Sequence, residues 1–466
     1  MITLFRSNQT CAVDELKKKV GDQLKKLPQI IEPVGTPLMV LRYEFPCEKF
    51  DPFIWLRAQP RGPKMYWSDR KGSYQVAGIG VADLVRAQTH GSYKDILFAC
   101  EDRLSSENPH LRYYGGFSFN QKPSSKELSW RGFGQAYFFI PRFELTIEDS
   151  KYCFAVNVAA KDINEENINQ LIKGLDATYF LEETSDLKVP GFKSRHDFPS
   201  EQKWNQDLEG VIRAIKQKDY EKIVLARKTV LELDSVMDPM TLLEHLQRQT
   251  PHCFHFCFQL NDTAAFLGAS PECLYERKGR HLETEAIAGT KPRGENKTLD
   301  DQLKESLLNN PKEIREHRFV VNGIEQSLKK ICRKVEFDNE AALLKLKAGH
   351  HLMTRFKGLL RDNVSDHQIF ESLHPTAAVC GHPTTKALEV IEMFEPFDRG
   401  WYAAPVGYIG YDDTQFAVAI RSALLEGHKL SLYAGAGIVE GSTAQGEWQE
   451  IEGKIKTFLK LFHEKR

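Results

Sequence analysis

The sequence has no long hydrophobic run, no excess of charge of one sign and no recognisable secretion signal. No segment approaches the roughly 18 apolar residues of a membrane span, and the first residues lack the apolar stretch and small-residue cleavage site of a signal peptide. The 63 Lys and Arg nearly cancel the 64 Asp and Glu, so no overall field attracts nucleic acid or an anionic membrane. We therefore expect a cytoplasmic protein with neither of these partners.

Paired cysteines and internal repeats are also missing. The nine cysteines are scattered through 466 residues without the spacing of a disulfide framework, which predicts free thiols in a reducing compartment. No repeat with a period of roughly 20 to 50 residues is present, which excludes solenoids and propellers. What is present is a hydrophobic fraction of 41% and a charged fraction of 27%, typical of a globular protein with a large core.

Residues 1–198 are predicted to form a β-rich N-terminal portion. Apolar residues at helical spacing predict one amphipathic helix over residues 13–24. Alternating and aromatic-rich segments then predict strands at residues 38–45, 64–67, 74–79, 112–119, 135–145 and 152–159. The polar stretch at residues 187–200, which contains Pro190 and Gly191, is the best candidate for a boundary or a crossing loop.

Residues 199–466 hold almost all the chemically suggestive segments and are expected to form the catalytic portion. A helix is predicted over residues 204–215 and a strand over residues 222–233, and strands and helices continue to the end of the chain. The fold class predicted for the whole chain is α/β of the α+β type, with long antiparallel sheets. We expect the two portions to be intertwined in one structural unit.

Lys222 begins a segment, Lys-Ile-Val-Leu-Ala-Arg-Lys, whose β-branched residues are typical of a buried strand. Side chains alternate across a strand, so Lys222 shares a face with Val224 and Ala226. An amine beside small apolar neighbours loses hydration, which favours its neutral form, and it could then act as a base. The alternative is a strand-end lysine in solvent.

Two glutamates that follow are further candidates. Glu272 ends the segment Gly-Ala-Ser-Pro-Glu, which predicts a tight turn presenting a carboxylate at a sheet edge; it is either a general acid with a raised pKa or an exposed turn residue. Asn310 and Pro311 predict the start of a helix, and Glu316 lies on this helix. Carboxylates near such a helix end either complement the helix dipole or bind a metal ion.

A helix near the C-terminus carries a third group of charges. Glu447, Glu450 and Lys454 have the spacing i, i+3 and i+7, so two carboxylates and an ammonium share one helix face. Carboxylates with no nearby Cys or His favour a hard ion such as Mg²⁺. The alternative is a solvated helix face.

Arg421 ends a predicted strand, Phe-Ala-Val-Ala-Ile-Arg, in which it shares a face with two alanines. The space beside its guanidinium suits bidentate recognition of a carboxylate, although a buried arginine paired with an internal acid is a competing interpretation. The segment Ala-Gly-Ala-Gly-Ile that contains Gly437 would let backbone amides approach a bound anion.

Three further segments resemble known binding motifs but lack the residues or the spacing that those motifs require. The glycines at 289 and 294 have phosphate-loop spacing, but Glu295 and Asn296 stand where Lys and Ser or Thr are needed. The glycines at 435, 437 and 441 are spaced one residue too widely for a dinucleotide fingerprint. His255 and Cys257 alternate with phenylalanines, which indicates a strand buried on both sides and not a zinc site.

Taken in order along the chain, these segments resemble the chorismate-binding enzymes, the family of isochorismate, salicylate, anthranilate and aminodeoxychorismate synthases. The matching segments are residues 222–227, 266–272, 284–290, 315–317, 374–381, 400–408, 420–423, 434–439 and 447–454. Residues 112–119 and 138–145 resemble the isochorismate synthase branch in particular. The resemblance implies an anthranilate synthase component I-like fold, in which helices surround two large antiparallel sheets and the active site lies in a cleft.

The resemblance also implies a role for each candidate residue. Lys222 matches the base that activates water and Glu272 the acid that protonates a departing hydroxyl. The Mg²⁺ ligands would be Glu316 and Glu450, with Glu447 close by. The residues implied to contact the substrate, chorismate, are Gly289, His374, Tyr402, Arg421, Gly437 and Lys454.

The implied reaction is the Mg²⁺-dependent conversion of chorismate to isochorismate, in which water adds at C2 and the C4 hydroxyl leaves. A lysine at position 222 favours water over ammonia as the nucleophile, because relatives that install ammonia usually lack it. Salicylate synthase is the nearest alternative and anthranilate or aminodeoxychorismate synthase a more distant one. We expect a monomer without a glutaminase subunit, and the pathway supplied, menaquinone, siderophore or salicylate synthesis, stays open.

Overall fold

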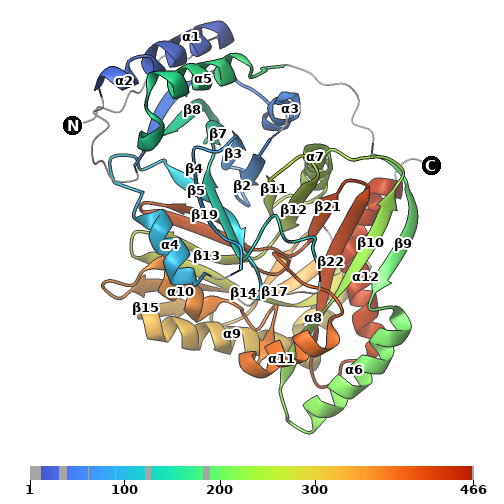
Figure 1. The fold of residues 1–466 in the computed structure, drawn as a ribbon. Helices are drawn as coiled ribbons and strands as arrows, with labels where there is room; N and C mark the ends of the chain where they lie inside the picture. Colours follow the sequence, from blue (N-terminus) through green and yellow to red (C-terminus); the bar gives the residue numbers. More distant parts are fainter. Residues whose placement is uncertain are drawn as a thin grey trace.

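Two large antiparallel sheets form the centre of the molecule (Figure 1). The computed structural model describes residues 12–30, 39–60, 62–89, 91–120, 127–181, 189–347 and 349–463. Every strand pairing in these residues is antiparallel. The predicted fold class is therefore confirmed.

The larger sheet contains 12 strands in the described part of the chain. In spatial order they are β1 (Val40–Pro46), β8 (Lys151–Ala159), β7 (Phe143–Glu148), β3 (Tyr74–Ile79), β2 (Lys64–Ser68), β11 (Phe254–Gln259), β12 (Ala264–Ser270), β21 (Ser422–Glu426), β22 (Lys429–Ile438), β10 (Lys222–Leu233) and β18 (Gly381–His382), with β9 (Phe192–Phe198) also paired to β10.

The smaller sheet contains 10 strands among the described residues. Their order is β15 (Cys332–Phe337), β17 (Gly349–Leu360), β14 (His281–Pro292), β13 (Cys273–Lys278), β20 (Asp413–Val418), β19 (Pro405–Gly410), β5 (Arg112–Phe117), β6 (Ala136–Ile140) and β4 (Asp83–Ala87), with β16 (Ala342–Lys345) also paired to β17. Both sheets thus contain strands from before and after residue 198.

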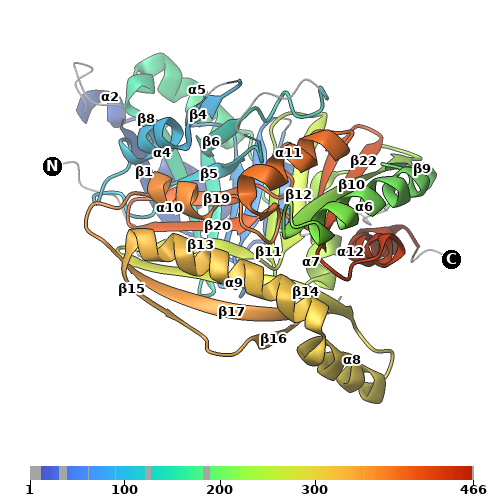
Figure 2. The same cartoon turned by 90° about the horizontal axis from the view of Figure 1, so that it is seen from below.

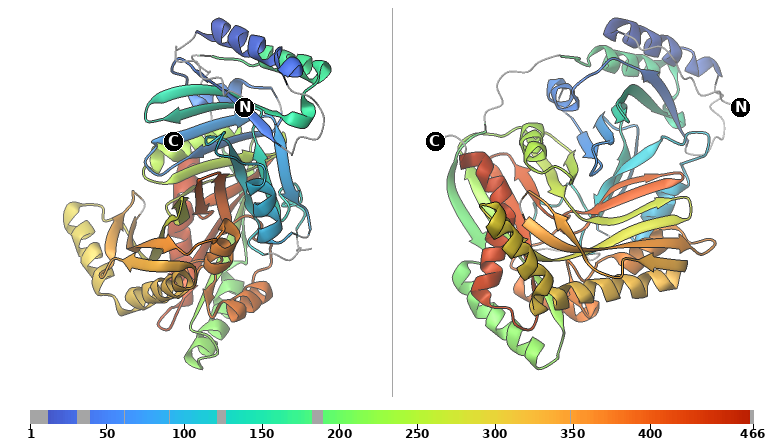
Figure 3. Two further views of the ribbon diagram at one scale, coloured as in Figure 1. Left: turned by 90° about the vertical axis from the view of Figure 1, so that its left-hand side faces the viewer. Right: turned by 180° about the vertical axis from the view of Figure 1, so that it is seen from behind.

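Helices pack around the sheets, as the views from below, from one side and from behind show (Figures 2 and 3). They are α1 (Val13–Leu24), α2 (Leu27–Ile30), α3 (Pro52–Ala58), α4 (Tyr93–Glu101), the 3₁₀ turn η1 (Ala160–Asp162), α5 (Glu165–Asp176), α6 (Glu201–Lys216), α7 (Pro239–Gln249), α8 (Lys297–Asn309), α9 (Pro311–Ile331), α10 (Asp366–Leu373), α11 (Thr384–Phe394) and α12 (Ala444–His463). Among the described residues, no helix combines the length and apolar character that crossing a bilayer requires.

Two of these helices carry candidate residues, and their sequences explain their positions. Helix α9 begins where the Asn310 side chain accepts hydrogen bonds from the amides of Lys312 and Glu313, directly before Pro311. It lies along the smaller sheet, against β14 and β17 (Figure 2). Helix α12 packs on β22 of the larger sheet and buries Trp448, Ile451, Ile455, Phe458 and Leu461. Each of the two helices therefore packs on a different sheet.

Two of the segments in which the chain passes from one sheet to the other lie side by side. The chain passes from β12 to β13 through Pro271 and Glu272, and from β20 to β21 through residues 419–421. The crossings are hydrogen bonded to each other, because the Val418 amide donates to the Glu272 carbonyl at 3.1 Å and the Ala269 amide donates to the Arg421 carbonyl at 3.1 Å. This arrangement brings two candidate residues, far apart in sequence, to one place.

Two local predictions are wrong. The polar stretch predicted as a boundary or crossing loop contains strand β9, which pairs with β10; its polar side chains fit an edge strand whose residues are mostly part-exposed. Strand β20 ends at Val418, and Arg421 lies beyond it with a φ of 50°, so Arg421 does not share a strand face with the alanines. The direction of Arg421 comes from the crossing and not from strand alternation.

Candidate active site

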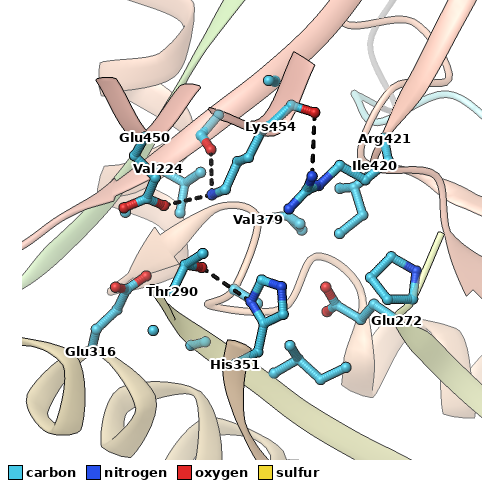
Figure 4. A pocket seen from close by; sticks show the side chains of 18 of the residues that line it. Val224, Glu272, Thr290, Glu316, His351, Val379, Ile420, Arg421, Glu450 and Lys454 are labelled. Carbon is cyan, nitrogen blue, oxygen red and sulfur yellow. Dashed lines mark hydrogen bonds and ion pairs between the residues drawn. The ribbon is translucent and has the colours of Figure 1, made fainter. Parts of the chain in front are cut away.

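A pocket lies between the sheets, where α9, α12 and the two crossings meet (Figure 4). About 680 Å³ of space free of protein atoms lies within it, including solvent at its open mouth. Its lining residues are Val224, Pro271, Glu272, Ile287, Ala288, Gly289, Thr290, Glu316, His351, Ala378, Val379, Tyr402, Ile420, Arg421, Ala434, Gly435, Gly437, Glu450 and Lys454. Eight of the eleven candidate residues are among them, and the other three, Lys222, Glu447 and His374, are described below.

Lys222 is completely buried at the start of β10, which rules out the strand-end lysine in solvent. Its Nζ lies 3.2 Å from Oε1 of Glu316 on α9 and has no hydrogen-bond partner among the described residues. Both neighbours on this side, Glu316 and Gly437, line the pocket. The amine therefore lies at the edge of the pocket, and the contact with Glu316 is the one ion pair that its Nζ makes among the described residues.

Glu272 is also buried, with 3% of its surface exposed, so the exposed turn residue is ruled out as well. Burial raises its pKa to about 8, and the negative charge of Glu285 adds to the effect, while Lys222 and Lys454 oppose it. A carboxyl group with this pKa keeps its proton at neutral pH, as a general acid must. Figure 4 shows its carboxyl group at one end of the pocket and those of Glu316 and Glu450 at the other.

Carboxylates from α9 and α12 are concentrated at that second end. Glu450 accepts a hydrogen bond from Lys454 at 2.6 Å. The two side chains therefore lie on one face of the helix, as their spacing predicted. Glu447 is 1% exposed and does not line the pocket, but lies one turn away, where Lys312 donates to it at 2.7 Å. Burial and Glu450 raise the pKa of Glu447 to about 7. A solvated helix face is excluded by this burial.

Arg421 and Lys454 add positive charge beside the pocket. Arg421 donates to the Lys454 carbonyl at 3.2 Å, and Lys454 also donates to the Gly435 carbonyl at 2.8 Å. No carboxylate forms an ion pair with Arg421 among the described residues, so the internal acid of the competing interpretation is not found. Burial lowers the pKa of Arg421, and the guanidinium faces the pocket in Figure 4.

Gly437 and Gly435 expose main-chain groups to the pocket because a neighbouring strand ends early. The pairing of β21 with β22 stops at Tyr433. On the other side of β22, Gly437 is opposite Val224, whose amide donates away from β22 to the Cys380 carbonyl at 2.8 Å. This makes them a non-hydrogen-bonded pair, so the Gly437 amide points to the open side of β22. The predicted approach of a backbone amide to an anion is therefore geometrically available.

The remaining substrate-contact candidates are placed differently. Gly289 lines the pocket at a bulge of β14, with a φ of 79° that suits glycine. Tyr402 lines it too and stacks on Tyr433 with ring centroids 5.4 Å apart. His374 is buried, with its ring edge-on to Phe119 at 5.8 Å, and does not line the pocket. The structure thus brings together all the candidates except His374.

Two polar residues of the site were not anticipated from the sequence. His351 on β17 lines the pocket, and its Nδ1 lies 3.1 Å from Thr290 Oγ1; burial lowers its pKa to about 3, so the ring is neutral. Glu313 accepts a hydrogen bond from the Thr290 amide at 2.9 Å. The only sequence signal for Glu313 was its place in the first turn of α9, and a histidine in a strand carries no signal of its own.

The histidine and cysteine that were predicted to belong to the core, and not to a zinc site, are buried. His255 and Cys257 are buried in β11, and burial lowers the pKa of His255 to about 4. The eight cysteines in the described residues are free thiols. His382 lies on β18 outside the pocket, with its Nε2 3.4 Å from a carboxylate oxygen of Glu221.

A family model described as "Chorismate binding enzyme" matches residues 35–463. The chain belongs to the chorismate-binding enzyme family. The expectation from the sequence motifs is confirmed, and the family match covers both halves of the chain. The pocket is accordingly the candidate active site of a chorismate-binding enzyme.

Similar chorismate-binding enzymes are named as isochorismate synthases. The chloroplastic isochorismate synthase of Catharanthus roseus is 36% identical over 405 residues, which are 84% of this chain and 69% of that protein. Isochorismate synthase MenF of Bacillus subtilis is 30% identical over 470 residues, covering 95% of this chain and 96% of the relative.

Solved structures show the same fold. The menaquinone-specific isochorismate synthase MenF of Escherichia coli matches with a TM-score of 0.83 at 26% identity, covering 97% of this chain and 99% of that chain. Anthranilate synthase component I of Streptococcus pneumoniae matches with a TM-score of 0.67 at 22% identity, covering 83% and 92%. The anthranilate synthase component I-like fold expected from the sequence is confirmed.

Proposed function

We propose that this protein is an isochorismate synthase that converts chorismate to isochorismate. The observation that carries the proposal is the buried Glu272 carboxyl, whose pKa of about 8 keeps it protonated. It shares one pocket with the cation Arg421, and the amine of Lys222 lies at the edge of that pocket next to Glu316. The proposal is supported by relatives of that name that match this chain over most of its length. An acid, an amine and an anion anchor are what the reaction requires.

The reaction divides between the two candidate catalytic residues. Lys222 takes a proton from water as the water oxygen bonds to C2 of the ring, and the ring double bonds shift. Glu272 gives its proton to the C4 hydroxyl, whose C–O bond breaks, and water departs. One water enters and one leaves, so the product is an isomer of the substrate. After the reaction, Lys222 releases the proton that it gained to solvent, and Glu272 takes up a proton from solvent.

The substrate carries two carboxylates, and the proposal gives each a place. Arg421, the Gly437 amide and Lys454 would receive the carboxylate of the enolpyruvyl arm, because they present positive charge and an open main-chain donor at one wall of the pocket. The ring carboxylate would lie at the end of the pocket that holds Glu316 and Glu450. Tyr402 and Gly289 would border the ring.

A divalent ion is needed at that end, since carboxylates would otherwise face a carboxylate. The residues fit one: Glu316 and Glu450 line the pocket, the buried Oε2 of Glu447 has no hydrogen-bond partner among the described residues, and burial and Glu316 raise the pKa of Glu313. Two carboxylates are a usual protein contribution to a Mg²⁺ site. Mg²⁺ held there by Glu316 and Glu450 would offset the charge of the ring carboxylate and orient the ring.

One assay tests the proposal. The purified protein is incubated with chorismate and Mg²⁺, and isochorismate, salicylate and pyruvate are separated chromatographically. Isochorismate as the accumulating product is expected. Equal amounts of salicylate and pyruvate would identify a salicylate synthase, and anthranilate or aminodeoxychorismate on addition of ammonia would identify an ammonia-using relative; either result contradicts the proposal.

A further inference from the structure

The crossing segment that carries Glu272 has every main-chain polar group engaged. The Glu272 amide donates to Ser270 Oγ at 3.2 Å, and its carbonyl accepts from the Val418 amide at 3.1 Å. The carbonyl of Pro271 before it and the amide of Cys273 after it are buried in the same crossing and need partners too. Both partners are side chains from other parts of the chain.

Arg70 and Glu285 supply these partners. Arg70 donates to the Pro271 carbonyl at 2.9 Å, and Oε1 of Glu285 accepts from the Cys273 amide at 2.8 Å. The two side chains also bind each other in a two-pronged ion pair, with N–O distances of 2.7 and 2.9 Å. The pair therefore holds the residues on both sides of Glu272.

The Arg70–Glu285 ion pair joins segments that are far apart in the sequence. Arg70 comes from the turn between β2 and β3 in the first half of the chain, and its guanidinium lies over the Phe254 ring at 5.2 Å. Glu285 lies on β14 of the smaller sheet and its side chain is 4% exposed, whereas that of Arg70 is 30% exposed. A planar guanidinium gripping both carboxylate oxygens fixes their mutual orientation.

We infer that Arg70 and Glu285 are positioning residues for Glu272, holding the main chain on both sides of the proposed catalytic acid and placing their charges beside it. This inference rests on the proposed function. Neither residue lines the pocket, so neither touches the substrate. They act through the main chain of residues 271–273 and through the charge that they place beside the acid.

The charges that face Glu272 come from several elements. Glu285 on β14 raises the pKa of Glu272 in addition to the larger effect of burial, while Lys222 on β10, Lys454 on α12 and Arg70 lower it. Tyr402 is a further titratable neighbour, whose pKa burial raises. Removing the carboxylate charge of the pair should therefore lower the pKa of Glu272, and removing the guanidinium charge should raise it.

The test compares Glu285→Gln and Arg70→Gln in the full-length protein. The pKa of Glu272 is followed by NMR of glutamate labelled with ¹³C at the side-chain carboxyl, with Glu272→Gln to assign the signal. The pKa is expected to fall in Glu285→Gln and rise in Arg70→Gln. The basic limb of kcat/KM against pH for chorismate turnover should move in the same two directions, because that limb reports the acid of the free enzyme.

The matched control is Arg57→Gln. Arg57 on α3 also joins the two halves of the chain through an ion pair, donating to Glu244 on α7 at 2.6 Å, but neither residue lines the pocket. It should lower thermal stability without moving the pKa of Glu272. Unmoved or identically moved pKa values in the two test variants would overturn the inference. The NMR titration needs no turnover, so a protein that does not convert chorismate refutes the proposed function while this result still decides the inference.

Discussion

A Cβ atom added to Gly437 would lie 2.2 Å from Oε1 of Glu316 and 3.1 Å from Cε of Lys222. The strand β22 therefore approaches helix α9 and strand β10 more closely than any side chain at this position allows. Only glycine leaves the Lys222–Glu316 pair where it is.

We predict that Gly437→Ala displaces both partners and lowers kcat/KM by about a hundredfold, since small misplacements of catalytic groups have effects of this size. Overpacking should also destabilise the fold by about 1–3 kcal/mol. Gly453→Ala is the control, because Gly453 lies on α12 with nothing near its added Cβ. It should keep activity and slightly raise Tm. Unimpaired turnover by Gly437→Ala would contradict the assigned geometry.

Lys222→Ala should lower kcat by about 10²–10⁴-fold, the usual contribution of a general base. The fold should persist, since the Lys222 amine makes no hydrogen bond among the described residues. Lys228→Ala is the matched control: Lys228 is on the same face of β10 but pairs with Glu127 outside the pocket. Chromatography of products and thermal melts check the two expectations. Equal losses in both variants would remove Lys222 from the mechanism.

Glu316→Gln should raise the Mg²⁺ concentration needed for half-maximal rate, because a neutral amide is a weaker ligand than a carboxylate. Glu325→Gln, on the same helix and paired with Lys329 at 2.6 Å, should leave the Mg²⁺ titration unchanged. The measurement is rate against metal concentration at saturating chorismate. A curve for Glu316→Gln that overlays that of the unaltered protein would exclude this glutamate as a ligand.

Glu272 should make the folded protein less stable as pH rises. Its pKa is about 8 in the folded protein and about 4.3 in an unfolded chain, so between these values the folded state binds the extra proton and stability falls with increasing pH. Glu272→Gln, which mimics the protonated form, should therefore raise Tm at pH 9 much more than at pH 5. Thermal melts across this range check the sign; an equal effect at both pH values would contradict it.

Arg421→Ala should raise KM for chorismate by about tenfold to a hundredfold, corresponding to a lost charged hydrogen bond of about 1.5–3 kcal/mol. Arg421→Lys should recover only part of the loss, because a point charge cannot grip both carboxylate oxygens. Lys429→Ala, outside this pocket, is the control. Steady-state kinetics separate KM from kcat. A change in kcat alone would assign Arg421 to a different role.

Much of the fold can be predicted from local sequence pattern. The strand over residues 222–233 and the start of α9 at Pro311 have the predicted bounds, because β-branched runs and capping residues act within a few positions of the chain. The burial of Lys222 and Glu272 could not be predicted in the same way. A lysine at a strand end and a glutamate after a proline look alike in solvent and in a pocket.

The residues that the sequence did not reveal depend on contacts between distant segments. Arg70 stands in Asp-Arg-Lys-Gly-Ser, which has the composition of a solvent-exposed turn, and only its pairing with Glu285 gives it a role. Arg421 was placed on a strand because Phe416 to Ile420 are apolar, yet the crossing between sheets turns the chain after Val418. His374 matched a motif but faces Phe119. For Arg70, Arg421 and His374 alike, the contacts of the side chain depend on where the folded chain places it.

Each sheet joins a block of strands from the first half of the chain to a block from the second half, where β2 pairs with β11 and β5 pairs with β19, and Arg70 reaches across to the segment that holds the acid. A smaller catalyst consequently cannot be obtained by trimming residues from the amino end, since this would open both sheets and release Glu272 at once. Hybrids between relatives face the same restriction. Exchanging one half for that of another protein would require the strand pairs that join the halves in both sheets to match simultaneously.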